Sequence, residues 1–208
     1  PTQDIAEAAK KHNVPIFLSG RTTSDIANMV ITYLNKLLAP SVDMHGVLLN
    51  VDGMGVLLVG DSGIGKSETA LELVRRGHML VSDDSVTIKR VGDSAYGQSP
   101  KITQGFLEIR GVGIVDVERL FGVEALQNVK RIDLVIELER WVEDKQYDRI
   151  GRETSLINIL GLQLPKIVVP VTAGRNLAIV IEAAALNHHL RQSGYIAADE
   201  LDKRIKNS

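Results

Sequence analysis

The strongest constraint on this chain is a glycine-rich segment that lies between an apolar run, residues 55–59, and a helix-forming run, residues 68–76. The segment fits the phosphate-binding pattern G-x-x-x-x-G-K-[S/T]. Its glycines let successive backbone N–H groups and a helix N-terminus point at phosphate oxygens. We expect a nucleoside triphosphate to bind there, with Lys66 as a mobile positive charge and Ser67 as a Mg²⁺ ligand. The predicted phosphate-binding residues are Gly60, Asp61, Ser62, Gly63, Ile64, Gly65, Lys66 and Ser67.

Composition narrows the classes of protein to which the chain can belong. Its 208 residues are 44% hydrophobic, which is enough for a buried core. A formal net charge of −2 without a Lys/Arg cluster argues against a nucleic-acid partner. The absence of cysteine excludes disulfides and a cysteine nucleophile, and no apolar segment has membrane length. We therefore expect a soluble, cytoplasmic protein that does not bind a membrane.

The chain begins with Pro1 rather than Met and continues directly into a helix-like segment. This suggests that a longer protein has lost its N-terminal part. We predict that residues 1–39 are a remnant of an N-terminal domain with a linker helix. Residues 40–208 are then the catalytic domain.

Apolar periodicity and turn residues predict the elements of this fold. Helices are predicted at residues 4–12, 23–38, 68–76, 176–192 and 197–206. Strands are predicted at residues 15–18, 47–51, 55–59, 78–81, 86–91, 132–138 and 167–171. Asp52-Gly53 favours a hairpin turn, so the strand before the phosphate loop should have an antiparallel neighbour. Residues 92–100, rich in Gly, Ser and Pro, are predicted as a loop. The fold class is α/β, a phosphate-loop protein with a mixed sheet and flanking helices.

Two adjacent aspartates, Asp83 and Asp84, end the short strand that follows the helix of the phosphate loop. Ligands in open α/β sheets lie beyond the carboxyl ends of strands, so this pair is expected near the bound phosphates. Phosphoryl transfer needs a metal ligand and a carboxylate base, and either aspartate could serve each role. A turn that favours Asp is the alternative. Glu137, at the end of another apolar run, is a weaker candidate because it continues an alternating strand pattern.

The segment from Leu107 to Asp116 carries two charged residues, Glu108 and Arg110, at period-two spacing. The two should therefore share one face of an extended segment. Taken alone, the pattern favours an edge strand with an ion pair on its surface. Arg149, Arg175 and His45 are ordinary when each is taken alone.

Together these segments resemble bacterial HPr kinase/phosphorylase, over almost the whole chain. The most specific match is Leu-Glu-Ile-Arg-Gly-Val-Gly-Ile-Val-Asp at residues 107–116, joined by His45-Gly46-Val47, the phosphate loop and Tyr147-Asp148-Arg149. The resemblance implies a catalytic domain similar to the nucleotide site of phosphoenolpyruvate carboxykinase, in a hexamer. It implies phosphorylation of a serine of HPr, the phosphocarrier of the sugar phosphotransferase system, by ATP or pyrophosphate. It also implies removal of that phosphate by inorganic phosphate, and a role in carbon catabolite repression and sugar uptake.

The resemblance also implies roles for single residues. Lys66 would hold the β- and γ-phosphates, and Asp84 would take the seryl proton in one direction and return it in the other. His45 and Arg149 would complete the catalytic set. The Mg²⁺ ligands would be Ser67, Glu108 and Asp83. The segment tied to dephosphorylation would be Pro170, Val171, Thr172, Ala173, Gly174 and Arg175.

Two other classes of function remain open from the residues. One is a phosphate-loop kinase of a small metabolite, which would transfer phosphate to small alcohols. The other is a nucleotide-switched binding module, which would bind ATP without transferring phosphate. Within that class, no Asn-Lys-x-Asp guanine motif and no Leu-Ser-Gly-Gly-Gln motif occurs.

Overall fold

The computed structural model describes residues 2–143, 145–148, 155–172 and 174–207. Its contacts divide the chain into two units, Pro1–Ala39 and Pro40–Ser208. The first unit contains α1 (Gln3–His12) and α2 (Thr23–Leu37). The strand predicted at residues 15–18 is wrong, because the described part of this unit offers no second strand with which it could pair. Among the described helices, none combines the length and the apolar character needed to cross a membrane.

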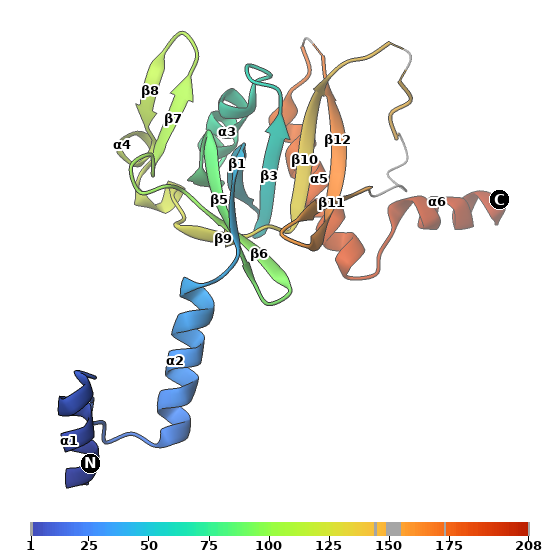
Figure 1. Ribbon diagram of the computed structural model, residues 1–208. Coiled ribbons are helices and arrows are strands. Elements are labelled where there is room, and N and C mark those ends of the chain that lie inside the picture. Colours follow the sequence, from blue (N-terminus) through green and yellow to red (C-terminus); the bar gives the residue numbers. More distant parts are fainter. Residues whose placement is uncertain (1, 144, 149–154, 173, 208) are drawn as a thin grey trace. The chain divides into compact units, whose positions relative to one another are not determined.

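The second unit is built on a mixed sheet of six strands in the order β11-β12-β10-β3-β2-β4 (Figure 1). The strands are β2 (Val47–Val51), β3 (Met54–Gly60), β4 (Met79–Ser82), β10 (Leu134–Arg140), β11 (Ser155–Ile159) and β12 (Leu162–Val171). Strands β3, β10 and β12 run parallel, and the other pairs are antiparallel. Asp52 and Gly53 form the expected hairpin turn, with φ angles of 48° and 84°. The predicted mixed α/β sheet is therefore confirmed.

Alternating side chains place two different cores on the two faces of this sheet. Val56 and Leu58 of β3 point to the face covered by α3 (Lys66–Arg75) and α5 (Leu177–Gln192). Leu57, between them, points to the opposite face. All three side chains are fully buried, as expected for a central strand covered on both sides.

The opposite face packs against a second, antiparallel sheet. Its strands, in the order β1-β5-β6-β9, are β1 (Ser41–His45), β5 (Ser85–Val91), β6 (Ser94–Gln98) and β9 (Val129–Arg131). Residues 92–100 are therefore not a loop as predicted, because β6 lies within them. A Cβ added at Gly97 would clash with the side chain of Leu48, so this glycine permits close approach of the two sheets rather than marking a turn.

The segment predicted as an edge strand is a separate hairpin of β7 (Phe106–Ile109) and β8 (Gly113–Asp116). Leu107 and Ile109 point into the core, whereas Glu108 and Arg110 are exposed. The shared face predicted for the two charged residues is consistent with this pattern. The remaining elements are α4 (Val117–Phe121), a short 3-10 helix (Val123–Ala125) and α6 (Ala197–Lys206). The hairpin and the carboxyl end of β3 frame the candidate site.

Candidate active site at the phosphate loop

The phosphate loop connects β3 to α3 and bends through glycines with positive φ. Gly60, Gly63 and Gly65 have φ angles of 140°, 76° and 104°, which side-chain-bearing residues rarely adopt. Ile64 points into the core and is 7% exposed, so it anchors the loop rather than facing a ligand. The loop and the N-terminus of α3 together offer backbone N–H groups as a potential phosphate cradle.

Lys66, the first residue of α3, lies back over the loop. Its Nζ donates hydrogen bonds to the carbonyl oxygens of Gly60, at 2.8 Å, and Asp61, at 2.9 Å. Burial lowers the pKa of Lys66 from its usual value, and the nearby Asp83 carboxylate partly offsets this effect. The ammonium group is therefore held within reach of an anion bound in the loop.

Asp83 directly follows β4 and is the buried member of the aspartate pair, with 4% exposure. Its carboxylate accepts hydrogen bonds from the Ser67 hydroxyl, at 2.9 Å, and from the backbone N–H of Glu108, at 3.0 Å. Burial raises the pKa of Asp83, while these two hydrogen bonds act in the opposite direction. Asp83 therefore joins the first turn of α3 to strand β7.

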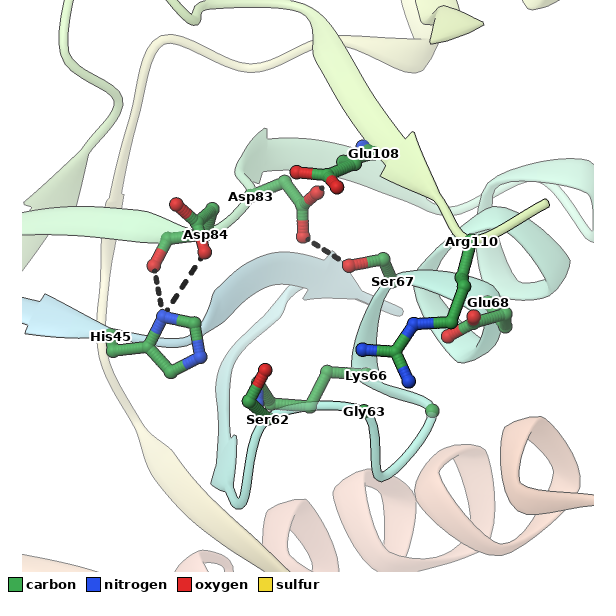
Figure 2. A pocket seen from close by; sticks show the side chains of 11 residues that line it. His45, Ser62, Gly63, Lys66, Ser67, Glu68, Asp83, Asp84, Glu108 and Arg110 are labelled. Atoms are coloured by element: carbon green, nitrogen blue, oxygen red, sulfur yellow. Dashed lines mark hydrogen bonds and ion pairs between the residues drawn. The ribbon is translucent and has the colours of Figure 1, made fainter. Parts of the chain in front are cut away.

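Asp84 is exposed and is paired with His45 at the end of β1 (Figure 2). Nδ1 of His45 lies 2.9 Å from the backbone oxygen of Asp84 and 3.1 Å from its carboxylate. Because both partner atoms are acceptors, Nδ1 carries the proton. Asp84 has a φ of 64°, an uncommon value for a residue other than glycine, and this turn directs it away from Asp83.

These side chains line one pocket of about 100 Å³. Its lining residues are His45, Ser62, Gly63, Gly65, Lys66, Ser67, Glu68, Asp83, Asp84, Glu108 and Arg110. Glu68 and Arg110 were not predicted as site residues. For Arg110 a usable signal existed, because its period-two spacing from Glu108 predicts that both lie on one face.

The charge of the pocket is consistent with a divalent cation. The pocket is lined by two positive side chains, Lys66 and Arg110, and by four carboxylates. With His45 neutral, the formal charge of the lining residues is therefore −2. The carboxylates are those of Glu68, Asp83, Asp84 and Glu108. Polyphosphate would be repelled unless a cation were added. Within the described residues, no three His, Asp or Glu side chains are placed to hold a metal by themselves. Mg²⁺ commonly uses one or two carboxylates together with substrate phosphates, so Ser67, Asp83 and Glu108 fit such a site.

Other predicted residues lie elsewhere. Pro170 and Val171 are the last residues of β12, and β10 lies between β12 and β3 in the sheet. The backbone oxygen of Pro170 accepts a hydrogen bond from Nη1 of Arg175 at 3.2 Å. None of the described residues of the segment 170–175 lines the pocket. Arg149 and Ala173 lie outside the described residues. Glu137, the weaker carboxylate candidate, pairs with Lys166 at 2.8 Å and does not line the pocket.

Comparison with known proteins identifies the family. Residues 36–205 match the family model described as HPr Serine kinase C-terminal domain. A protein named HPr kinase/phosphorylase from Caldanaerobacter subterraneus subsp. tengcongensis is 52% identical over 204 residues, which cover 98% of this chain and 67% of that protein. One of the same name from Lachnoclostridium phytofermentans is 49% identical over 208 residues, covering 100% of this chain and 67% of that protein.

A solved structure supports the same assignment. The HPr(Ser) kinase/phosphatase from Coxiella burnetii superposes with a TM-score of 0.68 at 37% sequence identity, covering 73% of this chain and 99% of that chain. The chain therefore belongs to the HPr kinase/phosphorylase family.

Proposed function

We propose that the chain is a protein serine kinase and phosphorylase that phosphorylates HPr with ATP or pyrophosphate and removes the phosphate with inorganic phosphate. The observation that carries this proposal is that one pocket contains both a phosphate loop and the exposed Asp84–His45 pair. The family match supports HPr as the protein substrate. Through HPr, the enzyme would regulate carbon catabolite repression and sugar uptake.

In the kinase direction, the seryl oxygen attacks the terminal phosphorus of the donor. The new bond joins the seryl oxygen to phosphorus, and the bridging bond between phosphorus and the leaving phosphate breaks. Asp84 accepts the seryl proton, and His45 orients its carboxylate through the 3.1 Å contact. Lys66 and the loop N–H groups hold the phosphates and stabilise the charge that moves to the leaving group.

The reverse direction uses the same residues in the opposite order. An oxygen of inorganic phosphate attacks the phosphoseryl phosphorus, the bond to the seryl oxygen breaks, and pyrophosphate forms. Asp84 returns its proton to the seryl oxygen. The phosphate loop holds inorganic phosphate where it otherwise holds the leaving phosphate of the donor, so one cradle serves both directions.

Mg²⁺, when bound, would neutralise charge on the phosphate chain. Its protein ligands would be Ser67, Asp83 and Glu108, which line the same pocket. The Asp83 carboxylate accepts hydrogen bonds from the Ser67 hydroxyl and from the backbone N–H of Glu108. Burial raises the pKa of Asp83, and a bound cation would stabilise its charged form. The proposal therefore includes a strict requirement for a divalent cation.

The test is to incubate the chain with Mg²⁺, ATP and purified HPr, and then to add inorganic phosphate. Phosphoserine on HPr, followed by its loss with release of pyrophosphate, is the expected result. ATP binding without transfer would instead indicate a nucleotide-switched binding module. Transfer to small alcohols but not to HPr would indicate a metabolite kinase. Either result refutes the proposal.

A further inference from the structure

The hairpin β7–β8 places a guanidinium group directly against the phosphate loop. A Cβ built on Gly63 would lie 2.8 Å from Nη1 of Arg110, 3.1 Å from Nη2 and 3.2 Å from Cζ. The missing side chain of Gly63 therefore makes room for Arg110. Both residues line the pocket, and Figure 2 shows the guanidinium pointing towards the loop.

The turn of the hairpin explains this placement. Ile109 and Gly113 are the last paired residues, so Arg110 is the first residue of the turn. The backbone N–H of Val112 donates to the Ile109 oxygen at 3.0 Å, and Gly111 has a φ of 84°. Since Leu107 and Ile109 are buried in the core, the base of the turn is fixed. Arg110 therefore projects from a supported hairpin rather than from a long loop.

The guanidinium has no competing partner among the residues described. Figure 2 shows no hydrogen bond or ion pair from Arg110 to the other pocket residues, although Glu68 and Glu108 line the same pocket. Arg119, on the following helix, differs because its Nε lies 3.5 Å from Asp116. A guanidinium presents a planar fork of donors that matches two phosphate oxygens. Arg110 thus has its fork available to an anion in the loop.

The position of Arg110 relative to Asp84 indicates which phosphate it would contact. In Figure 2, Asp84 and His45 lie on one side of Lys66 and Ser67, and Arg110 lies on the other. In phosphoryl transfer the attacking and leaving oxygens are roughly in line on opposite sides of phosphorus. If the acceptor hydroxyl lies beside Asp84, the leaving phosphate lies on the Arg110 side.

We propose that Arg110 binds the phosphate on the side away from the acceptor serine. This is the β-phosphate of ATP, or the leaving phosphate of pyrophosphate, in the kinase direction. It is the attacking inorganic phosphate in the phosphorylase direction. The inference rests on the proposed function, and it gives Arg110 a role that is specific to the phosphate substrate rather than to HPr.

The test compares Arg110→Ala and Arg110→Lys with the control Arg119→Ala, whose side chain is 87% exposed and does not line the pocket. Calorimetry measures binding of magnesium pyrophosphate, and steady-state assays measure KM for inorganic phosphate and for phosphorylated HPr. For Arg110→Ala we expect roughly 10- to 100-fold weaker pyrophosphate binding and a similar rise in KM for phosphate, from the loss of charge-assisted hydrogen bonds. The KM for phosphorylated HPr should stay within about twofold. Arg110→Lys should recover only part of the loss, because a lysine cannot bind two oxygens as a fork.

Added guanidinium ion should partly restore Arg110→Ala and leave Arg119→Ala unchanged. Unchanged pyrophosphate binding and phosphate KM in Arg110→Ala would overturn the inference, as would a rise confined to the KM for phosphorylated HPr. If Arg110→Ala fails to fold, the pyrophosphate affinity of Arg110→Lys and its KM for inorganic phosphate test the inference instead. Wild-type chain that binds pyrophosphate but never phosphorylates HPr would refute the proposed function, and this result is separate from the binding comparison.

Discussion

Replacing Glu182 by Gln should remove a network that ties α5 to the end of the phosphate-loop helix. The Glu182 carboxylate accepts hydrogen bonds from Nε and Nη2 of Arg76, both at 2.7 Å, and lies 2.9 Å from Nε2 of His78. The Glu182 side chain is 18% exposed and His78 is 8% exposed. The Arg76 hydrogen bonds, with a smaller contribution from His78, hold the pKa of Glu182 at about 2.

The magnitude follows from this pKa. A shift from 4.5 to about 2 corresponds to at most about 3 kcal/mol of stability in the charged form. Solvent at Arg76, which is 36% exposed, screens the pair and reduces the expected loss to about 1–2 kcal/mol. Because the folded-state pKa lies below the unfolded value, the contribution is complete above about pH 5. It is lost as pH falls through about 2.

Urea unfolding at pH 7 and at several values down to pH 3 measures this contribution. The matched control is Glu200→Gln, whose ion pair with Arg204 at 3.2 Å is exposed and should be worth less than about 0.5 kcal/mol. The difference between wild type and Glu182→Gln should shrink as the pH falls. Equal urea midpoints for Glu182→Gln and Glu200→Gln at pH 7, or a difference that grows towards pH 3, would refute the reasoning.

Three further predictions concern catalysis and packing. Asp84→Asn should lower the rates of HPr phosphorylation and dephosphorylation by about 10²-fold or more while equilibrium ATP binding survives; full activity would place the base elsewhere. Ser67→Ala should raise the Mg²⁺ concentration needed for half-maximal activity by about 10-fold, and an unchanged Mg²⁺ titration would remove Ser67 from the ligand set. Gly97→Ala should lower the free energy of unfolding by about 1–3 kcal/mol, because the new Cβ clashes with Leu48 between the two sheets. Urea unfolding measures this loss, and a stability equal to wild type would show that the sheets separate without cost.

Local sequence patterns predicted most elements correctly, and the failures share a physical cause. The hairpin at Asp52-Gly53 and the strand, loop and helix around residues 55–76 depend on contacts between near neighbours. Strand β6 was missed because its glycine serves packing against Leu48, a residue 49 positions earlier in the sequence. The β7–β8 hairpin was predicted as one edge strand, whereas the structure has a turn between Ile109 and Gly113, in which Gly111 has a φ of 84°.

The same division holds for the candidate site. The sequence alone determined that a glycine-bent loop joins a strand to a helix N-terminus at residues 60–67, because glycine conformation and helix starts are local properties. The residue pattern also placed Asp83 and Asp84 at the end of a strand but left their roles open, and only the family resemblance implied a separate role for each. Only the tertiary structure separated them, burying Asp83 under Ser67 and the β7 backbone and leaving Asp84 exposed beside His45.

Tertiary packing likewise places the guanidinium of Arg110 beside Gly63, although the two residues are more than forty positions apart in the sequence. Such contacts depend on how two sheets and a hairpin pack around shared cores. A periodic pattern specifies which face of a segment is buried, but it carries no information on which distant segment covers that face. For this reason the loop at residues 60–67 was evident from the sequence, and the side chains that surround it were decided by the fold.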